Sequence, residues 1–437
     1  MVKLIVAEQK HNCEHLLGKF VDESHYDFLI EEDCDVYMPP QMGEDPISEE
    51  RIVLKFRKNY FSKEQQDSAY AGLREAAIRT ENRGLASGIK DGILATTEGR
   101  EWVTNYQDEM MRALIKNRNS ALMDEDVIDT IRAKYPREVD KKMAGGDGKN
   151  NVWVISRFRG KFDFEVWLDS IKPMDREQRA KATEEVMKMV STTTYGSAVN
   201  SGIAGWFDRY PRIPYGRATS YTRDNFEKFK MAYPFLQTLS KGFKDLLPWR
   251  YNNQMEAATK LDPRFLVPGT PFTTITVNKT FRTAAHYDAG DLNSGLSNLL
   301  TLSNDGNYTG GYLIAPEYRV AVNVRPGDLL LINNHEVMHG NTEIKCAEGS
   351  ERVSLVCYFR EKMLDLGSFE YEDCRYNFVE SRRLNKEHPL WKPLWNGVSE
   401  GMWSTQEWYD YLESKLGQEE LIKMHPEANA SSLESFF

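Results

Sequence analysis

The chain has 437 residues, of which 41% are hydrophobic, and a formal net charge of −10. A chain of this size can bury a large core, and no run of it approaches the apolar length of a membrane span. The apolar stretch within residues 1–10 is too short for a signal peptide, and the net negative charge argues against binding nucleic acid through bulk electrostatics.

The N-terminal part of the chain is polar and acidic. Residues 1–50 contain Glu31-Glu32-Asp33-Cys34-Asp35 and then Pro39-Pro40, and we expect them to form an irregular arm. A strand is predicted over residues 51–56. Helices are predicted over residues 62–79, 98–116, 176–190 and 225–247, the first with a capping box at its start and the last interrupted near Pro234.

A glycine-rich segment and the five cysteines could suggest a phosphate site and a metal site, but neither pattern fits. Residues 144–150 are rich in glycine, but Asn150 stands where a phosphate-binding loop requires Ser or Thr, so we exclude that site. The five cysteines are odd in number and lack metal-type spacing: Cys13, Cys34, Cys346, Cys357 and Cys374. We expect reduced thiols and therefore a cytoplasmic or nuclear protein.

Positive charge is concentrated between residues 201 and 285. This stretch contains thirteen Lys or Arg against six Asp or Glu, and Tyr210, Tyr215, Tyr221 and Tyr233 are interleaved with them. Such a pattern suits a groove that touches phosphates and stacks bases. The alternative is a solvated basic face, and charge alone does not separate the two.

Short strands with tight turns are predicted over residues 299–332. Strands are expected at 299–302, 310–314, 318–324 and 329–332, with turns at 305–307 and 325–328. The sequence therefore predicts an α+β protein with a double-stranded β-helix (jelly-roll) core and flanking helices. No internal repeat is visible.

A candidate metal site flanks these strands. His286 and Asp288 are two residues apart, so on an extended strand both side chains reach one face. A third ligand is available from His335 or His339, which the spacing alone does not distinguish. Two His and one carboxylate form the facial triad of non-haem iron(II) oxygenases.

A candidate anion site follows in Arg352-Val353-Ser354. A guanidinium binds a carboxylate with two hydrogen bonds, and Ser354 on the same face of a strand adds a hydroxyl donor. This arrangement suits the far carboxylate of 2-oxoglutarate, whose keto acid end would chelate the iron.

These motifs resemble the TET/JBP family of Fe(II)- and 2-oxoglutarate-dependent dioxygenases. The resemblance is sharpest over residues 276–363, through Arg-Thr-Ala-Ala-His-Tyr-Asp, Gly-Gly-Tyr, Glu-Tyr-Arg-Val-Ala, Arg-Pro-Gly-Asp, His-Gly-Asn-Thr and Arg-Val-Ser-Leu-Val-Cys-Tyr-Phe-Arg-Glu. Weaker similarity extends back through residues 202–254 and to 83–88. The resemblance implies that His286, Asp288 and His339 bind iron and that Arg352 binds 2-oxoglutarate.

The family oxidises the 5-methyl group of pyrimidines in nucleic acid, which implies DNA as partner and a base that is flipped or single-stranded. Arg282 is a candidate for the keto acid end of the co-substrate, with a surface contact as the alternative. Asp291 is the candidate for reading the base. An ionised Asp accepts from the amine of cytosine and repels the oxygen of thymine, which tilts the prediction slightly toward 5-methylcytosine.

The sequence leaves alternatives open. The substrate could instead be RNA, a free nucleotide, a small metabolite or a protein side chain, ascorbate could replace 2-oxoglutarate, and the scaffold could be non-catalytic. A virus marking its genome, an alga or a protist would be a compatible source. We expect an arm at 1–50, an oxygenase domain at 51–370 with its helical part at 51–265 and its jelly-roll at about 266–365, and a Trp-rich extension at 371–437.

Overall fold

The computed structural model describes residues 2–80, 83–88, 173–175, 177–178, 198–209, 213–385, 387 and 405–417. The chain divides into two units, and the first consists of Met1–Gly88, Ala198–Phe378 and Ser404–Phe437. Every strand that the structure describes lies in this first unit. None of the described helices is both long and apolar enough to cross a bilayer.

The larger of two main sheets has ten strands. Along nine of them the order is β1 (Lys3–Val6), β3 (Cys34–Tyr37), β4 (Ile52–Arg57), β13 (Leu329–Ile332), β9 (Ser297–Ser303), β16 (Arg352–Tyr358), β8 (Thr274–Lys279), β6 (Val199–Phe207) and β5 (Ile78–Thr80), and β7 (Arg217–Ala218) pairs with β6. All of these neighbours are antiparallel except β1 and β3.

The smaller sheet has the order β14 (Gly340–Asn341), β11 (Leu313–Ala315), β12 (Val320–Val322) and β2 (Phe28–Ile30). From β8 onward the chain alternates between the sheets: β9 and β13 join the large sheet, β11, β12 and β14 the small one, and β16 returns to the large sheet. A separate antiparallel pair joins β10 (Tyr308–Gly310) to β15 (Ile344–Cys346).

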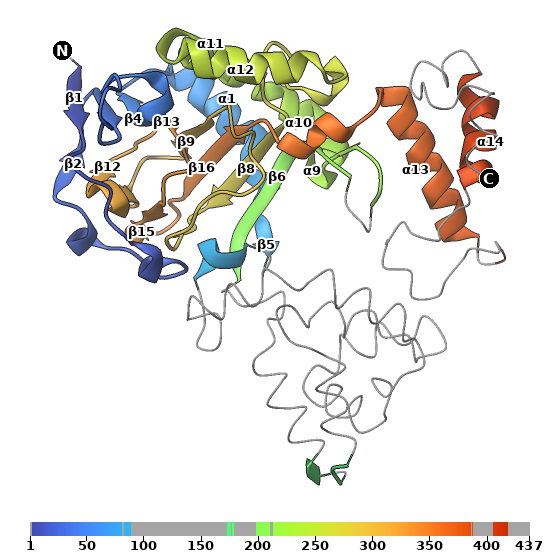
Figure 1. Cartoon of the computed structure of the whole chain (residues 1–437), viewed down its shortest axis with the longest axis horizontal. Helices are drawn as coiled ribbons and strands as arrows, with labels where there is room; N and C mark the ends of the chain where they lie inside the picture. The colour runs from blue at the N-terminus through green and yellow to red at the C-terminus, as the bar shows by residue number, and fades with distance from the viewer. Residues whose placement is uncertain are drawn as a thin grey trace. The chain divides into compact units, whose positions relative to one another are not determined.

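Both faces of the large sheet are covered. In β13, Leu329 and Leu331 pack toward a core shared with the helices, whereas Leu330 and Ile332 pack toward the small sheet. Burial on both faces explains why this strand is a continuous apolar run. The helical cover comes from α1 (Lys63–Leu73), α11 (Tyr233–Leu246) and α12 (Pro248–Thr259), and Figure 1 shows α11 and α12 lying side by side over it.

The predicted helices are present where the structure describes them. Ser62 and Gln65 form the capping box of α1, as predicted, but the helix ends at Leu73 and residues 78–80 become strand β5. The helix expected over 225–247 is interrupted as predicted, into α10 (Phe226–Met231) and α11, with α9 (Ser220–Asp224) before them. The helices expected at 98–116 and 176–190 and the loop at 144–150 lie almost wholly outside the described residues.

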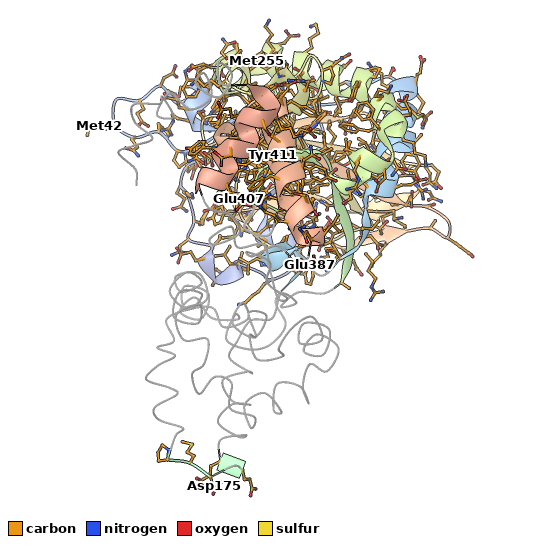
Figure 2. All side chains as sticks on the ribbon, turned by 90° about the vertical axis from the view of Figure 1, so that its right-hand side faces the viewer. Met42, Asp175, Met255, Glu387, Glu407 and Tyr411 are labelled. Atoms are coloured by element: carbon orange, nitrogen blue, oxygen red, sulfur yellow. The ribbon has the colours of Figure 1, made fainter. Side chains whose placement is uncertain are left out.

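Two expectations need correction. Residues 1–50 are not irregular throughout, because β1, β2 and β3 join both main sheets, although Met42 in the following loop is fully exposed (Figure 2). The single strand expected at 310–314 is broken by Gly310 and Gly311, whose φ values of 69° and 71° are left-handed. The chain therefore leaves β10 and enters β11 of a different sheet.

The C-terminal helices are α13 (Phe369–Leu384) and α14 (Thr405–Leu416). They pack through aromatic rings, since Trp408 of α14 contacts both Tyr371 and Phe378 of α13. Tyr411, which Figure 2 labels on the same helix, also packs against Phe378 at a ring distance of 5.1 Å.

Candidate active site

The two segments that carry the candidate ligands are joined by backbone hydrogen bonds. His286 and His339 form an antiparallel bridge, with N–H to O distances of 3.0 and 2.9 Å in the two directions. The N–H of Asp288 donates to the carbonyl of Asn334 at 3.0 Å. This bridge adds the His286 segment to the edge of the small sheet beside β14, so residues about fifty positions apart share one site.

His286, Asp288 and His339 form a compact cluster of possible metal donors. Their ligand atoms all lie within 4.8 Å of one another, and the Oδ1 of Asp288 is 3.3 Å from the Nε2 of His286 and 3.9 Å from that of His339. His335, the alternative third ligand, is not part of this cluster. The geometry therefore favours His339, as the family pattern does.

Neighbouring groups orient each donor. The Nδ1 of His286 lies 2.8 Å from the carbonyl of Ala284, and the Nδ1 of His339 lies 3.0 Å from the carbonyl of Val337. A proton on each Nδ1 leaves both Nε2 lone pairs directed at the cluster, which is the usual arrangement of metal-bound histidines. Asn334 donates its amide to the other oxygen of Asp288 at 2.9 Å.

Burial and charge favour unprotonated donors at two of the three positions. Burial and the neighbouring His286 lower the pKa of His339 to about 4. Burial opposes ionisation of Asp288, but hydrogen bonding to His286 and the two imidazoles lower its pKa to about 2. At His286, burial lowers the pKa, but the hydrogen bond to Asp288, the Asp288 charge and the backbone hydrogen bonds together raise it. Two imidazoles and a carboxylate fit iron(II), and a metal ion would replace the proton that His286 otherwise holds.

The cluster opens into a cavity of about 460 Å³. The cavity lies against the inner faces of the large-sheet strands, which contribute Thr276 and Asn278 of β8, Leu299 of β9, and Ser354, Val356 and Tyr358 of β16. The opposite faces of β8 and β16 belong to the core that is shared with the helices. Strand alternation thus separates the cavity side chains from the core side chains.

Arg352 lies on the same face of β16 as Ser354 and is fully buried. Its Nη2 donates to the hydroxyl of Thr301 at 3.2 Å and to the carbonyl of Gly311 at 3.5 Å, and its Nε has no partner. Among the described residues, no Asp or Glu neutralises it. A buried cation without a counter-ion is costly, so this site fits a ligand that brings a carboxylate, as 2-oxoglutarate would.

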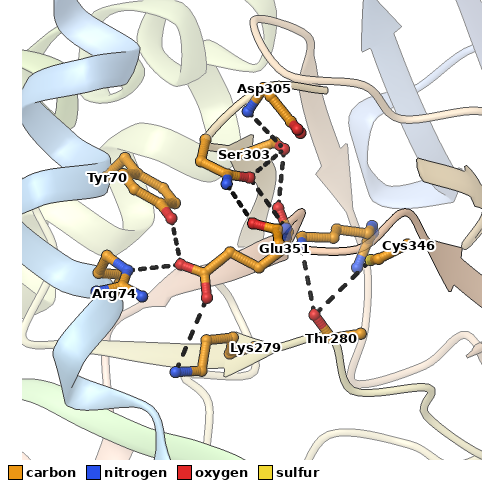
Figure 3. Close-up of polar contacts among 11 residues, drawn as sticks. Tyr70, Arg74, Lys279, Thr280, Ser303, Asp305, Cys346 and Glu351 are labelled. Atoms are coloured by element: carbon orange, nitrogen blue, oxygen red, sulfur yellow. Dashed lines mark hydrogen bonds and ion pairs between the residues drawn. The ribbon is translucent and has the colours of Figure 1, made fainter. Parts of the chain in front are cut away.

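The start of β16 is held by a polar network around Glu351 (Figure 3). The carboxylate of Glu351 accepts from the hydroxyl of Tyr70 and the guanidinium of Arg74, and lies 3.9 Å from the Nζ of Lys279. The Glu351 carbonyl accepts from Ser303 at 2.8 Å. The network therefore joins the end of α1 to the ends of β8 and β9, next to Arg352.

Arg282 is placed away from the cavity. Its guanidinium donates to the carbonyl of Val21 at 2.7 Å and to that of Asn341 at 3.2 Å, and lies over the ring of Phe20. It does not line the cavity that contains the triad. The structure thus gives Arg282 a role in holding residues 20–21, which its spacing from His286 did not reveal.

Asp291 lines the cavity together with Arg360, a residue that the sequence did not single out. Their backbones form a bridge, and the Arg360 guanidinium is paired with the buried Asp208. Burial and the charge of Asp288 raise the pKa of Asp291 to about 7, although Ser297 donates a hydrogen bond to it. The carboxyl group of Asp291 and the guanidinium of Arg360 thus line the same cavity.

Arg83 is the second cavity residue that the sequence analysis missed as a site residue. It lines the cavity with Gly84, Leu85 and Ala86, and its Nε is buried with no hydrogen-bond partner. The only signal for it was the weak family similarity of residues 83–88. A cation at this position faces Asp288 and Tyr358.

The basic stretch at 201–285 does not form a free cationic groove in the described part of the chain. Most of its cations are paired with acids: Arg209–Glu372, Arg223–Asp224, Lys228–Glu75, Lys230–Glu227, Lys241–Asp245, Lys260–Glu256, Arg264–Asp262 and Lys279–Glu351. The hydroxyl of Tyr221 donates to the carbonyl of Gly72, and Tyr215 is buried. The structure therefore favours the alternative of a solvated, internally paired face.

Comparison with known proteins identifies the segment that holds this site. Residues 203–361 match the family model Tet_JBP, described as the oxygenase domain of the 2OGFeDO superfamily. This range contains the triad, Arg352, Ser354 and Asp291. The segment is thus similar to the oxygenase domains of that superfamily, and Fe(II) and 2-oxoglutarate are the cofactors that the similarity implies.

The matching relatives are longer proteins. The thymine dioxygenase JBP1 of Trypanosoma brucei brucei is 36% identical over 171 residues, 38% of this chain and 20% of the relative. The bifunctional helicase and thymine dioxygenase JBP2 of Leishmania infantum is 32% identical over 295 residues, 66% of this chain and 26% of the relative. A solved structure of NgTET1 with 5mC DNA has 18% identity and a TM-score of 0.32, covering 39% of this chain and 64% of that chain.

Proposed function

We propose that this protein is a dioxygenase that hydroxylates the 5-methyl group of a pyrimidine base in DNA, using Fe(II), dioxygen and 2-oxoglutarate. The observation that carries the proposal is the partly buried cluster of His286, Asp288 and His339 in the cavity. Arg352, on the cavity strand β16, has no carboxylate partner and a buried Nε without a hydrogen bond, although it is not itself among the residues that line the cavity. The matched oxygenase segment and the names of the relatives support the same chemistry.

We infer that the core is a double-stranded β-helix. The support is that the chain passes repeatedly between two sheets, with β8, β16, β9 and β13 adjacent in one and β14, β11 and β12 adjacent in the other. The bridge between His286 and His339 continues the small sheet by one more segment. Such winding brings both ligand-bearing segments to one end of the sheets. The division into an oxygenase domain at 51–370 and an extension at 371–437 is part of this proposal, with β1, β2 and β3 of residues 1–50 paired to the sheets of that domain.

In this mechanism the site residues bind the metal, the co-substrate and the reacting methyl group. His286, Asp288 and His339 hold the metal, and Arg352 with Ser354 binds the far carboxylate of 2-oxoglutarate. Iron(II) with 2-oxoglutarate and dioxygen supplies the oxidant that converts a methyl C–H bond to C–OH, while the co-substrate becomes succinate and carbon dioxide. The apolar wall formed by Leu299 and Val356 excludes water from the reacting methyl group.

The base must leave the duplex stack to reach this cavity, or be single-stranded. Asp291 and Arg360 are the polar pair available to read it. An ionised Asp291 accepts from the amine of 5-methylcytosine, whereas a protonated Asp291 donates to the O4 oxygen of thymine. Burial and the charge of Asp288 raise the pKa of Asp291 to about 7 in the metal-free protein, and the preference between the two bases depends on this proton.

The test is nucleoside mass spectrometry on methylated and unmethylated duplex DNA, incubated with the protein, Fe(II) and oxygen, with and without 2-oxoglutarate. We expect a gain of one oxygen on 5-methylcytosine or thymidine that requires 2-oxoglutarate. His339→Ala should abolish it, and His335→Ala is the matched control that should not. If 2-oxoglutarate is converted to succinate while neither nucleoside changes, the proposed DNA substrate is wrong and the proposed iron chemistry stands.

A second candidate keeps the chemistry and changes the substrate to a free nucleotide or small metabolite. The pairing of most described cations in residues 201–285 favours it, because each paired Lys or Arg must first leave its carboxylate to bind a phosphate. Parallel assays on 5-methyl-dCTP, thymidine triphosphate and short DNA distinguish the two. Faster oxidation of the free nucleotides than of DNA would favour this candidate.

A further inference from the structure

Glu317 is a buried carboxylate outside the cavity. It lies in the short helical turn η9 (Pro316–Tyr318) between β11 and β12, and its side chain is only 4% exposed. Burying a carboxylate is costly unless donors surround it, so the identity of those donors shows what the residue holds in place.

Two of its donors come from the two ligand-bearing segments. The hydroxyl of Tyr287 donates to Oε1 of Glu317 at 2.8 Å, and the backbone N–H of Met338 donates to Oε2 at 2.8 Å. Tyr287 lies between His286 and Asp288, and Met338 directly precedes His339. One carboxylate therefore accepts a hydrogen bond from each of the two ligand-bearing segments, on the side away from the metal cluster.

A third donor comes from residues 1–50. The Nζ of Lys10 lies 3.2 Å from Oε1 of Glu317 and 3.4 Å from the carbonyl of Glu336. The N–H of His11 donates to the Glu317 carbonyl at 2.8 Å. The N-terminal segment thus reaches the same carboxylate that holds the metal-binding segments.

We propose that Glu317 is a positioning residue for the metal site and that Lys10 completes it, so that the N-terminal segment contributes to metal affinity. The ionised carboxylate fixes the two segments at the spacing that brings three donors within reach of one ion. This inference rests on the proposed function, because it assumes that His286, Asp288 and His339 bind a metal. Residues that orient metal ligands typically change metal affinity about 10- to 100-fold when altered.

The reason for a specific effect lies in the donors. Glu317→Gln has nearly the same shape, but one of its two former acceptor atoms becomes an N–H donor. The Met338 N–H and the Lys10 ammonium can only donate, so the single amide oxygen cannot serve both, and the Tyr287 hydroxyl must turn to accept from the new amide. Weaker, neutral hydrogen bonds then hold the two segments, and the three donors are positioned less exactly.

The measurement is Co(II) binding to the metal-free protein, followed by calorimetry and by the d–d absorption of the bound ion. We expect Glu317→Gln to weaken Co(II) binding about 10- to 100-fold, and Lys10→Met, at an exposed position, to weaken it several-fold without unfolding the protein. Tyr287→Phe should fall between the two, because it removes one donor and leaves the Met338 bond.

Asp328→Asn is the matched control. Asp328 is also buried, lies 3.2 Å from a lysine Nζ, that of Lys58, and accepts from the N–H groups of Asn59 and Arg325, but none of these residues adjoins a metal ligand. It should lower the melting temperature and leave Co(II) affinity unchanged. Unchanged affinity in both Glu317→Gln and Lys10→Met would overturn the inference, as would an equal loss in Asp328→Asn. Absence of Co(II) binding in the wild type would instead refute the proposed metal site.

Discussion

At the scale of single residues, Arg352 gives the sharpest prediction. Its guanidinium is buried without a carboxylate partner. Arg352→Met should therefore not reduce the free energy of unfolding of the ligand-free protein, because it removes a buried charge that nothing neutralises. It should abolish the stabilisation by 2-oxoglutarate, which amounts to about 2.7 kcal/mol at a concentration of about 100 times Kd.

The measurement is thermal unfolding of the metal-loaded protein under anaerobic conditions, with and without 2-oxoglutarate. Ser354→Ala keeps the guanidinium, so it should retain part of the ligand-induced shift in Tm. A Met variant that still responds fully to 2-oxoglutarate would show that the co-substrate binds elsewhere. Gly311 lies close to this guanidinium: a Cβ added at position 311 would be 3.1 Å from the Nε of Arg352.

Asp291 predicts a dependence of stability on pH. Burial and the charge of Asp288 raise its pKa to about 7 in the folded protein, above its ordinary value of 3.8. The folded state thus holds the proton more tightly. The resulting stabilisation is complete below about pH 3.8 and is lost as the pH rises through about 7.

Asp291→Asn should remove that loss. The difference in the free energy of unfolding between wild type and variant, measured by denaturant titration of the metal-free protein from pH 4 to 8, should change by at most about 1.4 kcal/mol per pH unit. Taking the difference cancels the titration of His286 and His339. A difference that does not vary with pH would mean that Asp291 stays ionised.

The sequence was informative for residues whose chemistry is rare in combination. From the sequence, His286, Asp288 and His339 were predicted to share one site, because metal binding requires such a combination of residues. The structure brings all three together. Arg282 was misplaced, since four residues of spacing say nothing about which carbonyl groups lie nearby. Arg83 and Arg360 were missed because an isolated arginine has no pattern, and only the folded chain shows that both line one cavity.

At the scale of elements, the network in Figure 3 predicts how β16 is anchored. Glu351→Gln should reduce the free energy of unfolding by about 2 kcal/mol, because the charged acceptor of Tyr70 and Arg74 is lost in a partly buried setting. Glu75→Gln is the matched control at the end of the same helical segment. Its ion pair with Lys228 is nearly half exposed on both sides, so the loss should stay below about 1 kcal/mol.

Denaturant unfolding of both variants checks this prediction. Equal losses would mean that the network at β16 is no stronger than a surface ion pair. If Glu351→Gln also raises the KM for 2-oxoglutarate, the anchoring of β16 reaches Arg352, which follows Glu351 directly. Glu75→Gln should not change that KM.

Elements were predictable where local rules decide them. The capping box of α1, the break near Pro234 and the strand β13 follow from capping, proline geometry and apolar runs. Residues 78–80 became a strand because they pair with β6, which no local signal announces. The strands β1, β2 and β3 were missed for the same reason, since their acidic surroundings conceal partners far along the chain.

At the scale of the whole molecule, charge distribution decides how DNA could be bound. Most described cations in residues 201–285 are paired with acids, so this stretch offers few unpaired cations for non-specific phosphate binding. Binding should depend instead on the cavity and on cations near it, such as Arg83. A protein of this kind would bind DNA weakly unless a base enters the cavity.

This predicts a shallow dependence of DNA affinity on salt. A phosphate contact contributes about 0.9 to the slope of log K against log salt. Lys228→Gln, Lys241→Gln and Lys260→Gln should each leave both the slope and the Kd for a methylated duplex unchanged within about twofold, because each lysine already has a carboxylate partner. Arg83→Gln should weaken binding, since its Nε has no partner in the protein.

Fluorescence anisotropy from 50 to 300 mM salt measures both quantities. If any of the three lysine variants lowers the slope by about 0.9, that lysine leaves its carboxylate for a phosphate on binding, and the basic stretch is a DNA surface after all. If all three are silent while Arg83→Gln is not, these lysines stay paired with their carboxylates and the cavity contributes to recognition. The rest of the chain then acts mainly as a scaffold that places one base beside His286, Asp288 and His339.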